Sequence, residues 1–211
     1  SQISIKLISL LLLPIAFGCA PTISNTSSGK DEAFSYPDLS KKTYCRGKGY
    51  VVSRGNINGR LSFTFTSSKD STYIEFRDLI GRKTLFLTLS KNTINAWDIR
   101  NNRSYDQESL VISFPFFELI KPNDLINFLW GKMPKTFTDS DNILNNKINS
   151  GQIQFSSQQT ENGILINSVS FNFEEENEAI DLFVESRDFD LQYPHLIREI
   201  PESIIQAKEK Q

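Results

Sequence analysis

The sequence predicts a mainly β domain, an antiparallel sheet of about ten or eleven strands with one or two short helices. The 211 residues include 16 Phe and only one Met, and aromatic residues favour strands. From Tyr44 onward, short runs of alternating apolar and polar residues follow one another, with turn residues between them. This close spacing is typical of an antiparallel meander, because parallel βαβ units need longer connections. The length suits one domain with appendages, or at most two small domains.

The first strands are predicted where apolar and polar residues alternate strictly, which gives each strand one face for the interior. The alternation is clearest around Phe63 and Phe65, and again around Ile74 and Phe76. The predicted strands are 61–66, 73–77, 84–89 and 93–99, interrupted at 78–83 and at a turn of Lys91 and Asn92.

One helix is predicted from its end signals. Pro122 suits a first helical position, and Gly131 suits the residue after a helix end. The apolar residues between them fall on adjacent helix faces, so the segment 122–130 is amphipathic. A weaker helical or coil stretch is expected over 34–42.

The second half of the chain continues the sheet after a polar stretch at 138–150. Asn167, Val169, Phe171 and Phe173 are expected to share one strand face. A large curved antiparallel sheet with one wet face needs a cover for its inner face, and an incomplete cover would leave an apolar cavity. The strands predicted here are 152–157, 163–174, 179–186, 195–200 and 203–207, with a solvated hairpin turn at 174–176.

The N-terminal region has the features of an export segment. Lys6 precedes an apolar run over 7–18, which is shorter than the roughly 20 residues needed to cross a bilayer. The run has the length of a signal-peptide core and ends in Gly18 and Cys19. A small residue before a cysteine at this place resembles the bacterial lipoprotein box. That resemblance implies a lipid attached to Cys19 and cleavage before it; the alternative is a plain secretory signal with an incidental cysteine.

The residues after Cys19 support a lipid anchor. Residues 21–30 are rich in Ser, Thr, Asn and Gly, a composition typical of a flexible tether. We therefore expect a lipoprotein signal peptide over 1–18, a lipid-anchored tether over 19–33 and a single domain over 34–211. By the sorting rule of enteric bacteria, Ala20 is compatible with the outer membrane, although such rules vary between lineages.

The sequence offers little for catalysis or for binding metals or nucleic acids. The net charge of −2 argues against a nucleic-acid partner. His195 is the single histidine, which leaves no usual zinc site or Ser-His-Asp triad with a G-x-S-x-G elbow. The glycines of 46–49 have no helix after them and predict no phosphate loop. We expect a non-enzyme without cofactor or metal, with Cys45 as a packed small side chain.

Four segments together resemble a known family. They are 60–65, the hairpin 75–81, the strand to Leu89, and the Trp-Gly-x-x-Pro segment that begins at Trp130. This order resembles the LolB-type outer-membrane lipoprotein receptors and, more broadly, the LolA/LolB-like fold. The resemblance implies an incomplete, strongly curved antiparallel barrel with short helices as a lid over a hydrophobic cavity. It also implies a monomeric, lipid-anchored protein of the bacterial outer membrane, facing the periplasm.

The family's activity gives the site residues expected here. Its members accept the acyl chains of lipoproteins from a periplasmic carrier, and an apolar hairpin tip helps to insert the cargo into the membrane. The matching tip is Leu79, Ile80 and Gly81, where Ile80 stands in place of the inserting leucine, and nearby Arg77, Arg82 and Lys83 could meet anionic head groups. Candidates for the cavity lining, for which plain core packing is equally consistent, are Phe63, Phe65, Ile74, Phe76, Leu85, Leu87, Trp97 and Trp130.

Two other functions remain open from the sequence. One is a lipoprotein of the same fold that binds a different lipid or senses mislocalised lipoproteins. The other is a structural outer-membrane lipoprotein whose sheet docks a partner complex. A preformed cavity favours the lipid-handling functions, whereas a filled core with an exposed apolar patch favours docking.

Overall fold

The computed structural model describes residues 37–55, 58–68, 70–113, 116–135, 146–148, 151–173, 177–190 and 204–206. By its contacts, Phe34–Gln211 forms a compact unit of its own, and all described residues belong to it. The expected signal peptide, the tether with Cys19, His195 and the turn at 174–176 lie outside the described residues.

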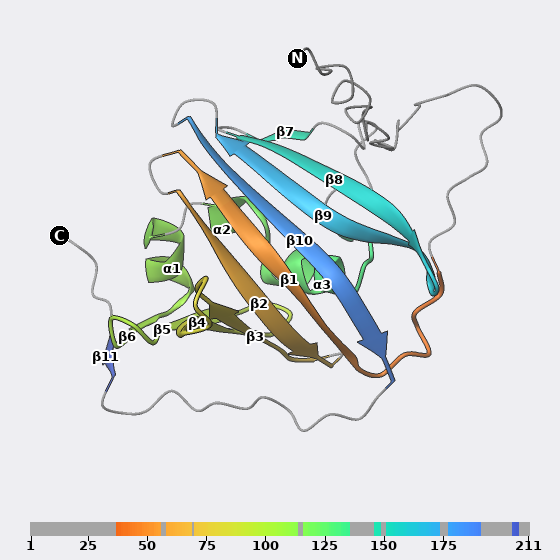
Figure 1. Ribbon diagram of the computed structural model, residues 1–211, viewed down its shortest axis with the longest axis horizontal. Helices are drawn as coiled ribbons and strands as arrows, with labels where there is room; N and C mark the ends of the chain where they lie inside the picture. Colours follow the sequence, from red (N-terminus) through yellow and green to blue (C-terminus); the bar gives the residue numbers. More distant parts are fainter. Residues whose placement is uncertain are drawn as a thin grey trace, which may run out of the picture. The chain divides into compact units, whose positions relative to one another are not determined.

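The described strands form one open, strongly curved sheet, which confirms the predicted fold class (Figure 1). Neighbouring strands are antiparallel except for β11, which runs parallel to β6. The order across the sheet is β11-β6-β5-β4-β3-β2-β1-β10-β9-β8-β7. The strands are β1 (Cys45–Arg54), β2 (Gly59–Ser67), β3 (Thr72–Arg77), β4 (Lys83–Leu89), β5 (Ile94–Asp98), β6 (Arg103–Tyr105), β7 (Asn146–Ile148), β8 (Gly151–Thr160), β9 (Gly163–Phe173), β10 (Glu178–Phe189) and β11 (Ile205–Gln206).

The described residues include three short helices, which are α1 (Gln107–Ser113), α2 (Phe116–Leu119) and α3 (Pro122–Leu129). Of these, α2 and α3 lie behind β1, β2 and β10 in Figure 1 and α1 lies to the left of β2, while β3 to β6 curl beneath them. No helix among the described residues is long and apolar enough to span a bilayer.

The helix predicted at 122–130 is confirmed as α3, and its end follows from Gly131. Gly131 has φ of 79° and donates its N–H to the carbonyl of Phe128 at 2.8 Å. Lys132 donates to the carbonyl of Asn127 at 2.9 Å. These two bonds form a Schellman motif, in which a glycine adopts the left-handed conformation without steric penalty. The described part of 34–42 is coil with a turn at Ser40 and Lys41 rather than helix.

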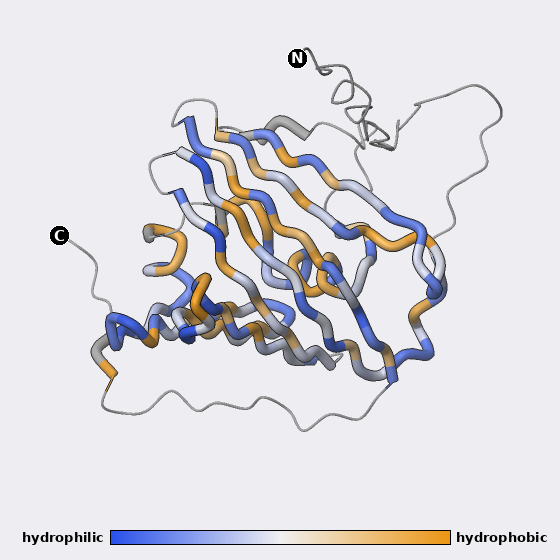
Figure 2. The backbone as a smooth tube through the Cα atoms, in the orientation of Figure 1, coloured by the Kyte–Doolittle hydropathy of each residue, from blue (hydrophilic) through white to orange (hydrophobic). Residues whose placement is uncertain are grey.

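The interior is built from cross-strand rows on one face of the sheet. Phe63 pairs with Phe76, which pairs with Leu85, and in the next row Phe65 pairs with Ile74. Hydrophobic and hydrophilic residues alternate along these strands in Figure 2, as expected for a sheet with one buried face.

Two glycines of β1 explain how the phenylalanine rings fit. Gly47 lies opposite Phe65, and Gly49 lies opposite Phe63. A β-carbon on Gly47 would lie 2.5 Å from the Phe65 ring, and one on Gly49 would lie 2.7 Å from the Phe63 ring. The glycines of 46–49 therefore make room for the core, a role that was not expected from the sequence.

Two expectations for the second half of the chain were wrong. Residues 138–150 were expected to be free of strands, but β7 lies within them and pairs with β8. Asn167 does not share a face with Val169, because a bulge shifts the register of β8 and β9 between Ser156 and Ser157. The shift leaves Asn167 outside the paired register, although its side-chain amide donates to Gln158 of β8 at 3.2 Å, and it lets Ile166 join the core.

Candidate functional site

The turn between β3 and β4 exposes two large aliphatic side chains, as predicted for the tip. Leu79 is 82% exposed and Ile80 is 75% exposed. Gly81, the third tip residue, has φ of 82° and no atom within 4 Å of an added β-carbon, so open space surrounds it. We call Leu79, Ile80 and Gly81 the tip.

Asp78 fixes the shape of the tip. One carboxylate oxygen accepts the N–H groups of Ile80 at 3.1 Å and of Arg82 at 2.9 Å, and the other accepts Arg82 Nε at 2.7 Å. Burial acts to raise the pKa of Asp78, but the hydrogen bonds from Arg82 and Ile80 outweigh it and hold this pKa below its ordinary value. The aspartate therefore stays charged at neutral pH and keeps the two aliphatic side chains presented to solvent.

The cations beside the tip are paired with carboxylates. Glu75 is buried and accepts Arg77 at 2.6 Å, while its other oxygen contacts Lys83 Nζ at 2.9 Å. Burial acts to raise the pKa of Glu75, but Lys83 and Arg77 together hold it below its ordinary value. Arg82 is bound to Asp78 in the same way. The three cations Arg77, Arg82 and Lys83 therefore exceed the two carboxylates, Glu75 and Asp78, by one positive charge. The apolar side chains, rather than a free basic cluster, are the dominant feature of this end.

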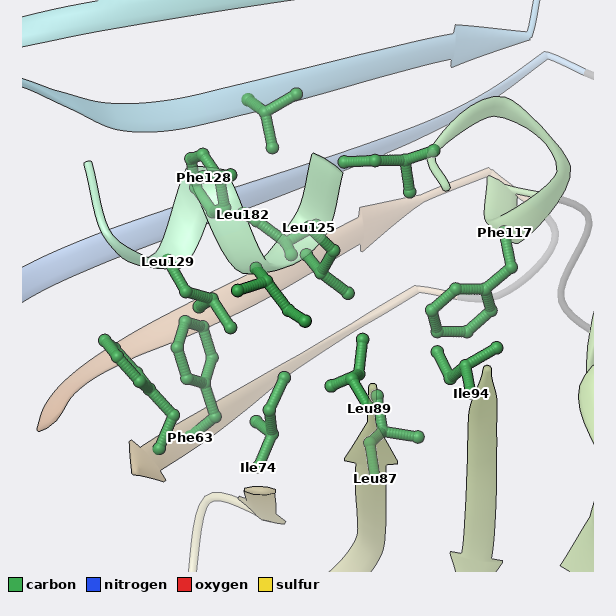
Figure 3. Close-up of a cluster of buried hydrophobic side chains, with 14 of the residues drawn as sticks. Phe63, Ile74, Leu87, Leu89, Ile94, Phe117, Leu125, Phe128, Leu129 and Leu182 are labelled. Atoms are coloured by element: carbon green, nitrogen blue, oxygen red, sulfur yellow. The ribbon is translucent and has the colours of Figure 1, made fainter. Parts of the chain in front are cut away.

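Six of the eight predicted cavity residues belong to the main hydrophobic cluster, and a seventh, Leu85, packs against it. The six are Phe63, Phe65, Ile74, Phe76, Leu87 and Trp130. Figure 3 shows that Phe63, Ile74 and Leu87 point from the sheet toward side chains of α3. Helix α3 contributes Leu125, Phe128 and Leu129, all of which are buried. The predicted lining is thus covered by α3, which packs directly on it.

Trp97 is the exception: it was predicted to line the cavity, but it lies outside the hydrophobic cluster. Ile94 and Ala96 in the same strand are buried in the cluster, whereas Trp97 pairs with Phe86 and is only half-buried. Since side chains alternate along a strand, Trp97 lies on the opposite face of the sheet.

The C-terminal end of α3 is fastened to the sheet by residues that sequence reasoning missed. Arg187 of β10 donates to the carbonyls of Leu129 at 2.7 Å, Phe128 at 3.0 Å and Ile166 at 2.7 Å. Burial lowers the pKa of Arg187 to about 10, which still leaves it protonated at neutral pH. No sequence motif predicts that Arg187 binds the end of α3, because its partners are backbone carbonyls of residues distant in sequence.

Trp130 adds a second fastening at the same end. Its indole Nε1 donates to Ser67 Oγ at 2.7 Å, and Ser67 Oγ lies 2.6 Å from Thr72 Oγ1. At the other end of α3, Lys121 occupies the N-cap position without a side-chain hydrogen bond to the helix. The bonds of Trp130 and Arg187 thus both hold the C-terminal end of α3 to the sheet.

The described residues contain no group of three His, Cys, Asp or Glu side chains placed to hold a metal ion. Cys45 is a buried free thiol, as expected, and burial raises its pKa to about 12.

No family model and no curated protein matches this chain. Several solved structures are similar to it, among them the following three. A DUF1329 family protein from Desulfovibrio piger has a TM-score of 0.49 and 9% identity, covering 74% of this chain and 89% of its own. An uncharacterized conserved protein from Thermus thermophilus has a TM-score of 0.38 and 9% identity, covering 81% and 93%. A LolA superfamily protein from Nitrosomonas europaea has a TM-score of 0.38 and 8% identity, covering 75% and 96%. At these scores the likenesses identify neither an activity nor a ligand.

Proposed function

We propose that this chain is a lipid-anchored acceptor of lipoproteins at the bacterial outer membrane. It takes the acyl chains of other lipoproteins from a periplasmic carrier and helps to insert them into the bilayer. The observation that carries the proposal is the tip, where Leu79 and Ile80 project into solvent next to the hydrogen bonds of Asp78. Two adjacent exposed aliphatic residues at the end of a hairpin are suited to enter a lipid surface.

The strength of such a contact explains why an anchor is needed. Burying an exposed Leu or Ile side chain contributes about 1.5–3 kcal/mol, so the two tip side chains together supply about 3–6 kcal/mol. That is similar to a single myristoyl chain, which binds membranes only marginally and reversibly. The tip alone is therefore too weak to hold the protein at the membrane. In this proposal a lipid on Cys19 holds it there, and the tip then enters the bilayer.

The acceptor function requires α3 to move, because α3 side chains already cover the apolar interior. Phe63, Ile74 and Leu87 form an apolar surface on the sheet, and α3 covers it. A bound acyl chain would take the place of α3 side chains on this surface. Because α3 is fastened at Trp130 and by Arg187, we expect it to pivot about that end, with the end at Lys121 moving away from the sheet.

Replacement of Ile80 by Asp tests the proposal. The full lipidated chain is placed in vesicles, and transfer of an acylated lipoprotein into them is measured. A charge at the tip opposes entry into lipid, so Ile80→Asp is expected to slow transfer at least about tenfold. Binding of the acylated lipoprotein, measured by co-elution in gel filtration, should be unchanged.

Ile112→Asp is the matched control, because Ile112 of α1 is also exposed, at 61%, but lies outside the tip. It should leave transfer intact. Normal transfer by Ile80→Asp would remove the tip from the function.

The filled interior favours a second candidate, a lipoprotein that docks a partner complex. The predicted cavity residues already have protein neighbours, so the described core needs no ligand to fill it. Co-elution with an acylated lipoprotein, compared with its deacylated form, separates the two functions. Binding that depends on the acyl chains supports the acceptor, and no binding to either form supports docking.

A further inference from the structure

A hollow of about 240 Å³ lies beside α3, at the surface next to the core residues Ile126 and Trp130. Its floor is apolar, formed by Leu39, Ile126 and the ring of Trp130. Lys42, Lys91 and Lys132 line it from three separate segments of the chain. We call this the lysine hollow. It lies at the opposite end of β3 from the tip, about 20 Å away for a strand of six residues.

The polar groups of the lysine hollow are donors rather than acids. No Asp or Glu lines it, although the chain as a whole carries a net charge of −2. Asn123 and Asn127 lie one turn apart on the same side of α3. Within the described part of the chain, no hydrogen bond engages the side-chain amide of either asparagine. Two asparagines and three lysines therefore line one space.

The acids near Lys42 and Lys91 leave donors for a ligand, whereas Lys132 lies close enough to Asp38 for their charges to interact. Lys42 Nζ contacts Asp190 at 2.6 Å, but an ammonium group has two further N–H donors. Lys91 lies 3.8 Å from Asp70, beyond hydrogen-bond distance, and both side chains are largely exposed. Such a surface pair is weak and readily rearranges. Lys132 lies over the Trp130 ring, 5.2 Å from its centroid, beside the floor of the hollow.

We propose that the lysine hollow binds the phosphate group of a small ligand. A phosphate offers several oxygens in different directions, which matches ammonium groups arriving from three segments. The apolar floor beside them suits the carbon part of a phosphate ester, such as the glycerol of a phospholipid head group. The inference goes beyond the proposed function, because the hollow and the tip are separate surfaces and either can be correct without the other.

The test follows the two indole N–H signals of the unit Phe34–Gln211 by NMR. The unit is titrated at constant ionic strength with inorganic phosphate, with glycerol phosphate, and with a short-chain phosphatidylglycerol below its micelle concentration. Trp130 lines the hollow and should shift saturably, whereas Trp97 lies on the other face of the sheet and should not move. Sodium chloride at the same ionic strength gives the baseline.

Three variants make the test specific. Lys91→Gln and Lys132→Gln should each weaken binding about tenfold, since each removes a charged donor. Lys48→Gln removes the same charge from an exposed position of β1 outside the hollow and should have no effect. All three positions lie at the surface or beside solvent, so the unchanged Trp97 signal reports that each variant is folded.

The titrants distinguish the two sources of phosphate. Tighter binding of the phosphatidylglycerol than of inorganic phosphate assigns the hollow to lipid head groups, whereas equal affinities assign it to free phosphate. The proposal is overturned if Trp130 shows no saturable shift with any of the three. It is also overturned if Lys48→Gln weakens binding as much as Lys132→Gln, because the effect would then be general screening.

Discussion

At the residue scale, Arg187 illustrates how the sheet holds its helix. Its guanidinium is directed at three backbone carbonyls, two of them in the last turn of α3. The carbonyls at a helix C-terminus carry partial negative charge and lack partners within the helix. A buried cation therefore satisfies the end of α3 and is itself stabilised by it, without a carboxylate among these bonds.

Replacing Arg187 by Met should destabilise the unit by about 1.5–3 kcal/mol, because charge-assisted bonds are lost and carbonyls are left unpaired. Urea unfolding of Phe34–Gln211 measures the change in free energy. Arg46→Met is the control, since Arg46 pairs with Asp188 at 3.0 Å at the surface, where such pairs contribute about 0–1 kcal/mol. Equal losses for the two variants would contradict the role assigned to Arg187.

Cys45 makes a second prediction at this scale. With its pKa raised to about 12 by burial, almost none of the thiol is ionised at pH 8, and the thiolate is the reactive form. Native Phe34–Gln211 should therefore react with a thiol reagent only as fast as it unfolds, and the same protein in urea should react at once. Rapid labelling of the native protein would show that Cys45 is accessible and would contradict its place in the core.

At the element scale, β1 is adapted to the rings that cross it. Gly47 lies under Phe65, and a β-carbon there would also meet the backbone carbonyl of Ser186 in β10. Neither neighbour moves easily, because one is in the core and the other is in the sheet. Strand β1 thus has glycine at the positions opposite Phe63 and Phe65, which leaves space for these rings of β2.

Gly47→Ala should lower the free energy of unfolding by about 1–3 kcal/mol, the usual range for overpacking a core. Gly59→Ala in β2 is the matched control, because no atom lies within 4 Å of its added β-carbon. Thermal or urea unfolding of both variants checks the difference. A stable Gly47→Ala protein would mean that the sheet adjusts at β1 more readily than the packing indicates.

The sequence predicted elements where one local signal dominated. Strict alternation located β2 and β3, and Pro122 with Gly131 bracketed α3. Helix α1 was missed although Asp106 caps it, accepting Ser109 N–H at 2.9 Å. The face of Trp97 and the bulge at Asn167 depend on strand register, and the convergence of three lysines depends on tertiary folding. Alternation alone determines none of these.

At the scale of the whole molecule, the described unit has two ends with different chemistry. The tip, beyond β3, is apolar, and the cations beside it are paired with Glu75 and Asp78. The lysine hollow, at the other end of β3, is rich in donors. The apolar interior lies between the two ends under α3. Such a division suits a protein that faces lipid at one end and binds polar groups at the other.

The central claim, that the tip enters a bilayer, is tested most directly by a fluorophore sensitive to polarity on Leu79→Cys of Phe34–Gln211. An N-terminal polyhistidine tag holds the protein on vesicles with nickel-chelating lipid, in place of the lipid anchor. Because native Cys45 is expected to be unreactive, the label marks the tip alone. A label on Asp70→Cys, at an exposed turn near the other end, is the control.

The account predicts that emission from the label at position 79 shifts to the blue when the protein is tethered. The label at position 70 should keep its aqueous spectrum. Adding Ile80→Asp should abolish the shift at position 79, because the charge opposes burial of the neighbouring side chain in lipid. An aqueous spectrum at position 79 on tethered protein would contradict the account and leave the tip as a contact for another protein.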